Sequence, residues 1–216
     1  MKLRAFNNQD KAMTRADVLA VIVLVIVLLI LVIMPMLAAH KAHSPRTACV
    51  NNLKEVYLGS LIWADDHNGK FPFEISVANG GTREFAEGGD VLKTFQVMSN
   101  ELATPKILYC PSDADHIWAA NFSSDFSAKN VSYFLGIDAD TNSPQSLFAG
   151  DDNFQINGVS VKPGLLKVPA NAPIGWTVAR HKYNGNIGFG DGSVQEATSP
   201  QLAANFTNTI TRLAIP

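Results

Sequence analysis

The chain holds only two cysteines, Cys49 and Cys110, among its 216 residues. Two thiols are too few for a disulfide scaffold or for a zinc site made of four thiolates. In an oxidising compartment the two would pair and close a loop of about 60 residues, which stabilises a fold by roughly 4 kcal/mol in the chain-entropy model. We expect this disulfide, with two unpaired cysteines in the core as the alternative.

A second candidate for chemistry is the stretch between residues 113 and 152, which holds seven aspartates and one lysine. It contains a segment that begins like an EF-hand loop, but Ser143 stands where that loop needs glycine and Ala149 where it needs glutamate. A different kind of calcium site remains one interpretation, because clustered oxygens suit a hard cation. The other is a solvated acidic loop with Asp and Asn in turns. The candidate ligands are Asp138, Asp140, Asn142, Asp151 and Asp152.

His181 and Asp191 have the residue types of a general base and the carboxylate that orients it. No serine or cysteine in a nucleophile-like setting accompanies them. We therefore favour a structural role, with turns at 184–185 and 191–192 on either side of a strand at 187–189. The five histidines also lack the spacing of a metal site. The sequence predicts that the chain is not an enzyme and has no cofactor, calcium apart.

The chain contains one long apolar segment, and the rest of it has an ordinary polar composition. With 47% hydrophobic residues, 17% charged residues and a net charge of −2, the chain is neither disordered nor a basic nucleic-acid binder. Residues 18–39 carry no charge, and as a helix they would span about 33 Å, against about 30 Å of hydrocarbon in a bilayer. The leader before them is basic, which favours a cytoplasmic N-terminus and an extracytoplasmic C-terminal region.

A helical pattern continues beyond this segment. Between residues 47 and 66 apolar side chains recur every three to four positions, as one face of a helix requires. Pro45 marks either a new helix start or a bend in one rod. Pro35 predicts a kink or a locally melted turn, with a helix end near the outer leaflet as the favoured alternative. Asn68 or Gly69 would end the helix in a left-handed cap. The apolar positions expected to face the core are Cys49, Leu53, Val56, Tyr57, Leu61 and Ala64. Ser60 is among the residues expected on the opposite, polar face.

The remainder of the chain predicts short strands and turns. Apolar runs at 71–77, 107–110, 131–137 and 187–189 alternate with Gly, Pro, Asn and Asp, and a modest helix is expected at 89–102. The expected fold class is α+β, with one long N-terminal helix (transmembrane plus amphipathic) packed on a small antiparallel sheet with long loops. The expected parts are a leader (1–12), a transmembrane helix (13–39), its extracytoplasmic continuation (40–66) and a globular β domain (67–216).

Several sequence blocks resemble type IV pilin-like proteins. The basic leader, the small residue Ala12, then Met13 and an acid at the fifth position from it (Asp17), followed by an apolar helix, resemble a prepilin signal. The blocks at 49–54, 67–72 and 109–113 look like signatures of bacterial pseudopilin-like proteins. His181, nine further residues and Asp191-Gly192 are similar to the family's C-terminal signature.

This resemblance implies a structural pseudopilin-like subunit of a type II secretion or type IV pilus-like assembly. It implies cleavage by prepilin peptidase between Ala12 and Met13, methylation of the new amine, and pairing of Asp17 with a neighbouring subunit's amine. The implied partners are other pilin-like subunits, as homo- or hetero-oligomers, and the inner membrane, with the C-terminal domain periplasmic or extracellular. Calcium loops also occur in major pseudopilins. The alternatives are a signal-anchored periplasmic hydrolase that uses His181 and a monomeric anchored binding module.

Overall fold

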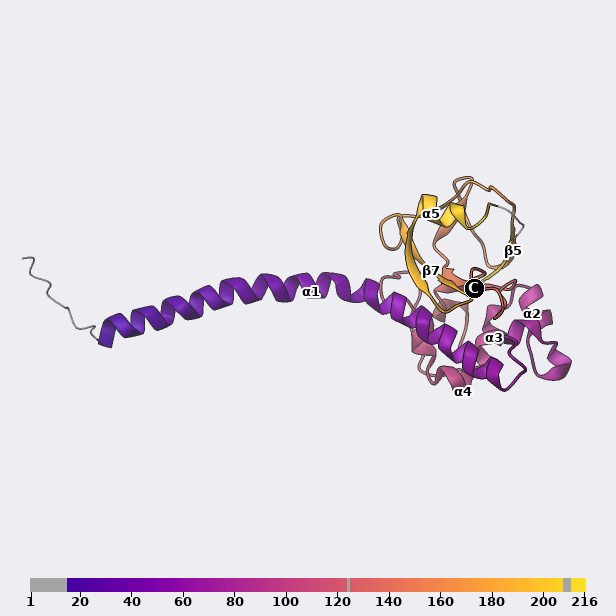
Figure 1. Ribbon diagram of the computed structural model, residues 1–216, viewed down its shortest axis with the longest axis horizontal. Coiled ribbons are helices and arrows are strands. Elements are labelled where there is room, and N and C mark those ends of the chain that lie inside the picture. Colours follow the sequence, from indigo (N-terminus) through magenta and orange to yellow (C-terminus); the bar gives the residue numbers. More distant parts are fainter. Residues whose placement is uncertain (1–14, 124, 208–210) are drawn as a thin grey trace, which may run out of the picture. The chain divides into compact units, whose positions relative to one another are not determined.

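The computed structural model describes residues 15–123, 125–207 and 211–216, and for residues 34–44 it describes the backbone alone (Figure 1). Ala12 and Met13, the expected processing site, lie outside the described residues. The chain divides into two compact units, Met1–Ser44 and Pro45–Pro216, which we describe separately.

Helix α1 comprises Arg15–Asp65 and continues as one helix through Pro35 and Pro45. Of the two alternatives at Pro45, the structure has a continuous helix, and the turn at Pro35 stays helical rather than melted. In the first unit, Arg15–Ile33 has a mean hydropathy of 3.5 and none of it is buried within the chain. This segment is long and apolar enough to cross a membrane.

In the second unit, the remaining part of α1 packs one face against the core. Leu53 and Val56 are buried as predicted, but Leu61 is 40% exposed and Ser60, expected on the polar face, is buried. Ser60 is four residues after Val56 and so shares its face, and its hydroxyl donates a hydrogen bond to the Val56 carbonyl at 2.9 Å. The helix ends as predicted, because Asn68 (φ 59°) and Gly69 (φ 72°) are both left-handed.

The globular unit contains two antiparallel sheets, so the mixed α+β class is confirmed. Six strands run in the order β5-β9-β1-β2-β7-β8 and three in the order β4-β3-β6. The strands are β1 (Tyr133–Gly136), β2 (Leu147–Asp151), β3 (Phe154–Ile156), β4 (Val159–Ser160), β5 (Gly164–Val168), β6 (Ile174–Trp176), β7 (Asn184–Phe189), β8 (Val194–Thr198) and β9 (Thr211–Ile215). The short helices are α2 (Arg83–Glu87), α3 (Val91–Val97), α4 (Ser99–Leu102) and α5 (Ser199–Ala204).

Two predicted strands are wrong. Residues 71–77 contain the 3-10 turn η1 (Pro72–Glu74) and the first residue of η2 (Val77–Asn79). Residues 107–108 are the end of the 3-10 turn η3 (Pro105–Leu108), and residues 109–110 follow it. A fourth such turn is η4 (Ala128–Asn130). A proline at the first position of η1 and of η3 fixes a helical φ, which favours a turn over an extended strand. The strands at 131–137 and 187–189 are confirmed as β1 and β7, and the helix at 89–102 divides into α3 and α4 at Met98.

The larger sheet has a hydrophobic core on each face. Along β1, Tyr133 and Leu135 belong to the core that includes α1 and α3, whereas Phe134 belongs to the core that includes β6 and α5. This alternation follows from the two-residue period of a strand. Burial of both faces explains why every residue of β1 and β2 is buried and why, apart from Asp151 at the end of β2, neither strand carries a charged side chain.

Candidate functional site: a buried polar cluster at the disulfide

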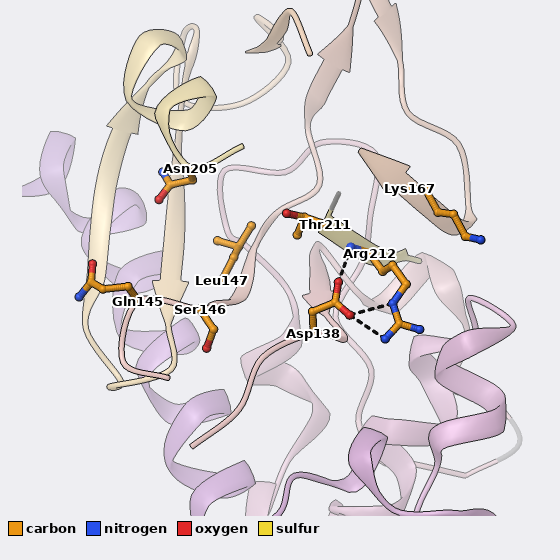
Figure 2. Close-up of a pocket in the computed structure, with 8 residues that line it drawn as sticks. All are labelled: Asp138, Gln145, Ser146, Leu147, Lys167, Asn205, Thr211 and Arg212. Atoms are coloured by element: carbon orange, nitrogen blue, oxygen red, sulfur yellow. Dashed lines mark hydrogen bonds and ion pairs between the residues drawn. The ribbon is translucent and has the colours of Figure 1, made fainter. Parts of the chain in front are cut away.

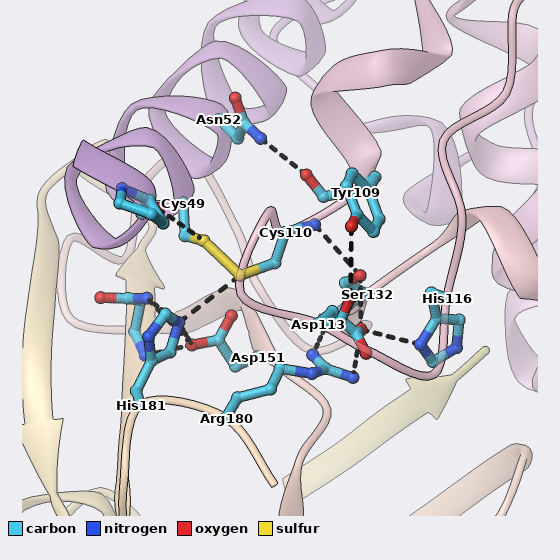
Figure 3. The surroundings of a disulfide bond; sticks show 12 residues. Cys49, Asn52, Tyr109, Cys110, Asp113, His116, Ser132, Asp151, Arg180 and His181 are labelled. Atoms are coloured by element: carbon cyan, nitrogen blue, oxygen red, sulfur yellow. Dashed lines mark hydrogen bonds and ion pairs between the residues drawn. A yellow bond between two sulfur atoms is a disulfide. The ribbon is translucent and has the colours of Figure 1, made fainter. Parts of the chain in front are cut away.

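Cys49 of α1 and Cys110, which follows η3, form a disulfide (Figure 3). This is the pairing that the sequence favoured. Both cysteines are fully buried. The Cys110 amide donates to the Ser132 hydroxyl at 3.1 Å, and the Asn52 amide of α1 donates to the Tyr109 carbonyl at 2.8 Å. The bond and these contacts attach α1 to the loop that leads into β1.

The imidazole of His181 lies against this disulfide (Figure 3). Its Nε2 is 3.5 Å from Cys110 Sγ, 3.5 Å from Asp151 Oδ2 and 3.4 Å from the Asn186 side-chain nitrogen. The side chain of His181 is only 3% exposed. Asp151 is the last residue of β2 and Asn186 lies in β7, and these two strands are paired. The sheet thus fixes the groups that face the imidazole.

An unusual turn places His181 there. His181, Lys182 and Tyr183 all have left-handed backbones, with φ of 45°, 53° and 63°. For residues other than glycine this conformation costs about 1 to 2 kcal/mol each, so surrounding contacts must hold it. The Asn184 side chain donates to the carbonyls of His181 at 3.3 Å and Lys182 at 3.2 Å, and Arg46 donates to the His181 carbonyl at 3.1 Å.

The carboxylate that faces His181 is Asp151, not Asp191. Asp191 lies in the turn between β7 and β8, where its side chain accepts a hydrogen bond from the Ser193 amide at 2.9 Å. The structure therefore does not form the base-and-carboxylate pair considered from the sequence. The turn at Asp191-Gly192 is confirmed, with Gly192 at φ 79°. A Cβ at Gly192 would lie 2.5 Å from the ring of Tyr57, so glycine lets this turn approach α1.

The predicted turn at 184–185 is wrong, because these residues begin β7, where Gly185 pairs with Ala197. The turn lies just before them, at residues 181–183. A Cβ on Gly185 would lie 2.5 Å from the Trp176 ring, so this glycine serves close packing within a strand rather than turn geometry.

Arg180, next to His181, forms a second set of contacts. It is buried, and its Nη2 lies 2.6 Å from Asp113 Oδ2 and also contacts Asp152 Oδ1. Its Nη1 donates to the Ser132 carbonyl at 2.8 Å. Asp113 also accepts hydrogen bonds from the Ser132 hydroxyl at 2.7 Å and contacts His116 Nδ1 at 2.7 Å. A buried cation is thus surrounded by acceptors.

These contacts have opposite effects on neighbouring titratable groups. Burial raises the pKa of Asp113, but the hydrogen bond from His116 and the charge of Arg180 outweigh it and hold that pKa well below its usual range. The hydrogen bond to Asp113 raises the pKa of His116 despite burial. Burial raises the pKa of Asp151 to about 7, although Arg180 opposes this. Burial, with Arg46 and Arg180, lowers the pKa of His181 to about 4, so His181 is neutral at pH 7.

The structure does not bring together the five residues considered for calcium. Asp138 forms an ion pair with Arg212 at 2.6 Å, in an open pocket of about 490 Å³ (Figure 2). Asp140 accepts hydrogen bonds from the backbone and side chain of Asn142. Asp151 pairs with Tyr133 at the start of β1, whereas Asp138 follows the end of that strand. These two positions therefore lie at opposite ends of β1, whose four residues span roughly 10 Å.

Chemically, the cluster has two sulfurs, one neutral imidazole and several carboxyl groups, all shielded from solvent. Sequence reasoning singled out Cys49, Cys110, His181 and Asp151 but missed Arg180. The sequence held one indication of its role. Arg180 precedes His181 and Asp152 follows Asp151, so a contact between His181 and Asp151 would suggest a second contact between Arg180 and Asp152.

Comparisons of the chain with family models, with curated proteins and with solved structures found no match. Its function has to be inferred from its own residues and geometry.

Proposed function

We propose that the protein is a pilin-like structural subunit of a type II secretion or type IV pilus-like assembly, anchored in the inner membrane by α1. The observation that carries this proposal is Arg15–Ile33, a helical segment that is apolar on all sides and exposed throughout within the chain. Such a helix needs lipid or other apolar helices around it. Membrane insertion followed by contact with other subunits would supply both.

The second half of α1 supports the same proposal. A simple anchor needs no contact with its domain, whereas this helix contributes Cys49, Leu53 and Val56 to the core and is joined covalently to Cys110. The domain is therefore built around the helix. In a subunit that assembles through its N-terminal helix, this construction would make the end of that helix part of the globular fold.

The resemblance described above assigns Asp17 to contact between subunits. A photo-crosslinking residue placed at Leu24 would report helix–helix contacts in intact membranes. We expect Asp17→Ala to abolish the crosslinked species, because the carboxylate would pair with a neighbouring subunit's N-terminal amine. Asp65→Ala, which changes an acid at the other end of α1, is the matched control and should leave crosslinking intact. Undiminished crosslinking in Asp17→Ala would contradict assembly through this residue.

Processing is tested separately by the intact mass of the protein extracted from membranes. We expect a chain that begins at Met13 and carries one added methyl group on its N-terminus. Ala12→Asp should block the cleavage, because prepilin peptidase sites have a small residue at that position. A wild-type chain that still begins at Met1 would refute the processing route and leave a permanently anchored protein.

A further inference from the structure

The two sulfurs and the imidazole at the disulfide form a compact set of metal-binding atoms. Cys49 Sγ, Cys110 Sγ and His181 Nε2 all lie within 4.8 Å of one another. In the part of the chain that the structure describes, this is the one group of three or more His, Cys, Asp or Glu residues arranged in this way. All three side chains are buried. Thiolate and imidazole are the ligands that zinc prefers.

The distances around His181 match the edges of a zinc tetrahedron. With Zn–S bonds of about 2.3 Å and Zn–N or Zn–O bonds of about 2.0 Å, a ligating nitrogen lies roughly 3.3 to 3.6 Å from the other ligand atoms, and two sulfurs lie about 3.8 Å apart. His181 Nε2 lies 3.5 Å from Cys110 Sγ and 3.5 Å from Asp151 Oδ2. Asp151 contacts the imidazole but is not part of the set of three ligand atoms that lie within 4.8 Å of one another. Its other oxygen is buried without a hydrogen-bond partner in the described structure.

The surroundings suit a bound cation. The Asp151 carboxylate is held beside the imidazole, because its Oδ2 accepts hydrogen bonds from the Asn186 backbone amide at 2.7 Å and from the Asn186 side chain at 2.9 Å. Two thiolates would neutralise Zn²⁺, and the neighbouring carboxylate would leave a net charge of −1. Arg180, whose positive charge already acts on Asp151, would balance it.

We propose that Cys49, Cys110 and His181 bind a zinc ion when the disulfide is reduced, with the Asp151 carboxylate next to the imidazole. A dithiol reductant would supply two electrons and two protons to the disulfide and would itself become a disulfide. Zinc binding then releases the two thiol protons as two Zn–S bonds form. Because both states use the same two sulfurs, the disulfide and the zinc complex exclude each other.

The test uses the full chain in detergent, reduced with a phosphine, desalted without oxygen and titrated with Co²⁺. We expect one Co²⁺ per chain, with thiolate-to-cobalt charge transfer and the intense visible bands of a tetrahedral site, and displacement by Zn²⁺. The oxidised protein should show neither the charge-transfer band nor the intense visible bands. A weak octahedral spectrum, or identical spectra from the oxidised and reduced proteins, would overturn the proposal.

Variants distinguish this site from binding by two thiols alone. His181→Asn and Asp151→Asn should each weaken Zn²⁺ binding by at least about 10-fold. His67→Asn changes a histidine that stacks on Trp63, away from the cluster, and should have no effect. Unchanged affinity in His181→Asn would refute the proposed ligand set.

A second measurement covers the case in which reduction loosens the fold. Near-ultraviolet circular dichroism of the reduced protein should show native tertiary packing, either directly or after one equivalent of Zn²⁺ is added. Bound zinc should also slow reoxidation of the two thiols. A reduced protein that stays without tertiary structure in excess Zn²⁺, or that reoxidises at the same rate with and without it, would count against the site.

Discussion

The buried cluster has two sides that differ in how their charges are compensated. The arginine side consists of Arg180, Asp113, Asp152, His116 and Ser132, and its cation contacts two carboxylates and a carbonyl. The sulfur side consists of Cys49, Cys110, His181, Asp151 and Asn186, and no cation lies within it at neutral pH, because the pKa of His181 is lowered to about 4. The two sides meet at two pairs of consecutive residues, Asp151-Asp152 and Arg180-His181.

This difference teaches that neighbouring residues of the same type can have opposite roles. Burial raises the pKa of both carboxyl groups, to about 7 for Asp151, but Asp152 contacts a guanidinium whereas Asp151 contacts a neutral imidazole. A compensated ion pair contributes to the fold, and removing one partner leaves a buried charge. On the sulfur side, three potential metal-binding atoms lie within 4.8 Å of one another.

The largest effect is expected from removing the disulfide. Without metal, the double variant Cys49→Ala, Cys110→Ala should lower the free energy of unfolding by about 4 kcal/mol, because a closed loop of 61 residues restricts the unfolded chain. Denaturant unfolding of the oxidised wild type and the variant measures this. A loss below about 1 kcal/mol would mean that the loop is already constrained in the unfolded state.

On the arginine side, Arg180→Met should lower the free energy of unfolding by about 3 kcal/mol, because it takes the guanidinium away from the buried Asp113 and Asp152 carboxylates. Arg212→Met is the matched control: this arginine is partly exposed and pairs with Asp138. Its removal should cost less than about 1 kcal/mol. Equal losses in the two denaturant curves would erase the distinction between buried and exposed arginines.

A smaller effect is expected in the pH dependence of the arginine side. Because the folded pKa of His116 is raised above 6.5, its contribution is fully present below pH 6.5 and is lost as pH rises through the raised value. Asp113, whose folded pKa is lowered from 3.8, contributes above that value and its contribution is lost as pH falls. The denaturant midpoint of unfolding should decrease as pH rises above 6.5, and this decrease should be smaller in His116→Gln. An unchanged slope in this variant would remove His116 from the network's energetics.

The smallest effect concerns the left-handed turn beside the sulfur side. Lys182→Gly should raise the free energy of unfolding by up to about 1 kcal/mol, since glycine avoids a penalty of about 1 to 2 kcal/mol but loses about 0.5 to 1 kcal/mol of backbone entropy. Lys70→Gly, at an exposed position without positive φ, should give no gain. A thermal melt compares the two, and destabilisation of Lys182→Gly would show that the lysine side chain itself holds the turn.

Local patterns predicted part of this fold because they act through neighbouring residues. The apolar segment, the cap at Asn68-Gly69 and the strands around Val131 and Ile187 each follow from a few adjacent side chains. The strands expected at 71–77 and 107–110 were wrong because proline at the start of a turn outweighed apolar composition. Leu61 and Ser60 exchanged their expected faces because only the packed structure shows which side of α1 meets the core.

The site was predictable only in its residue types. The two cysteines suggested their own pairing, since no other thiol competes. The partner of His181 was not predictable, because Asp151 reaches it through the register between β2 and β7, which sequence does not fix. Asp191 looked suitable from its place in a shared motif but lies in a separate turn. Arg180 was missed because burial of an arginine depends on acceptors from three distant segments.

The position of Cys49 also has a mechanical consequence. This residue lies near the start of the packed segment of α1, before Leu53 and Val56. A pulling force applied at Pro45 would reach the covalent crosslink before it reached the helix–sheet packing. The helix therefore could not be peeled from the domain turn by turn, and load would pass through Cys110 to the loop that enters β1. Under tension, the domain would have to begin to unfold in the parts that lie outside the loop closed by the Cys49–Cys110 disulfide.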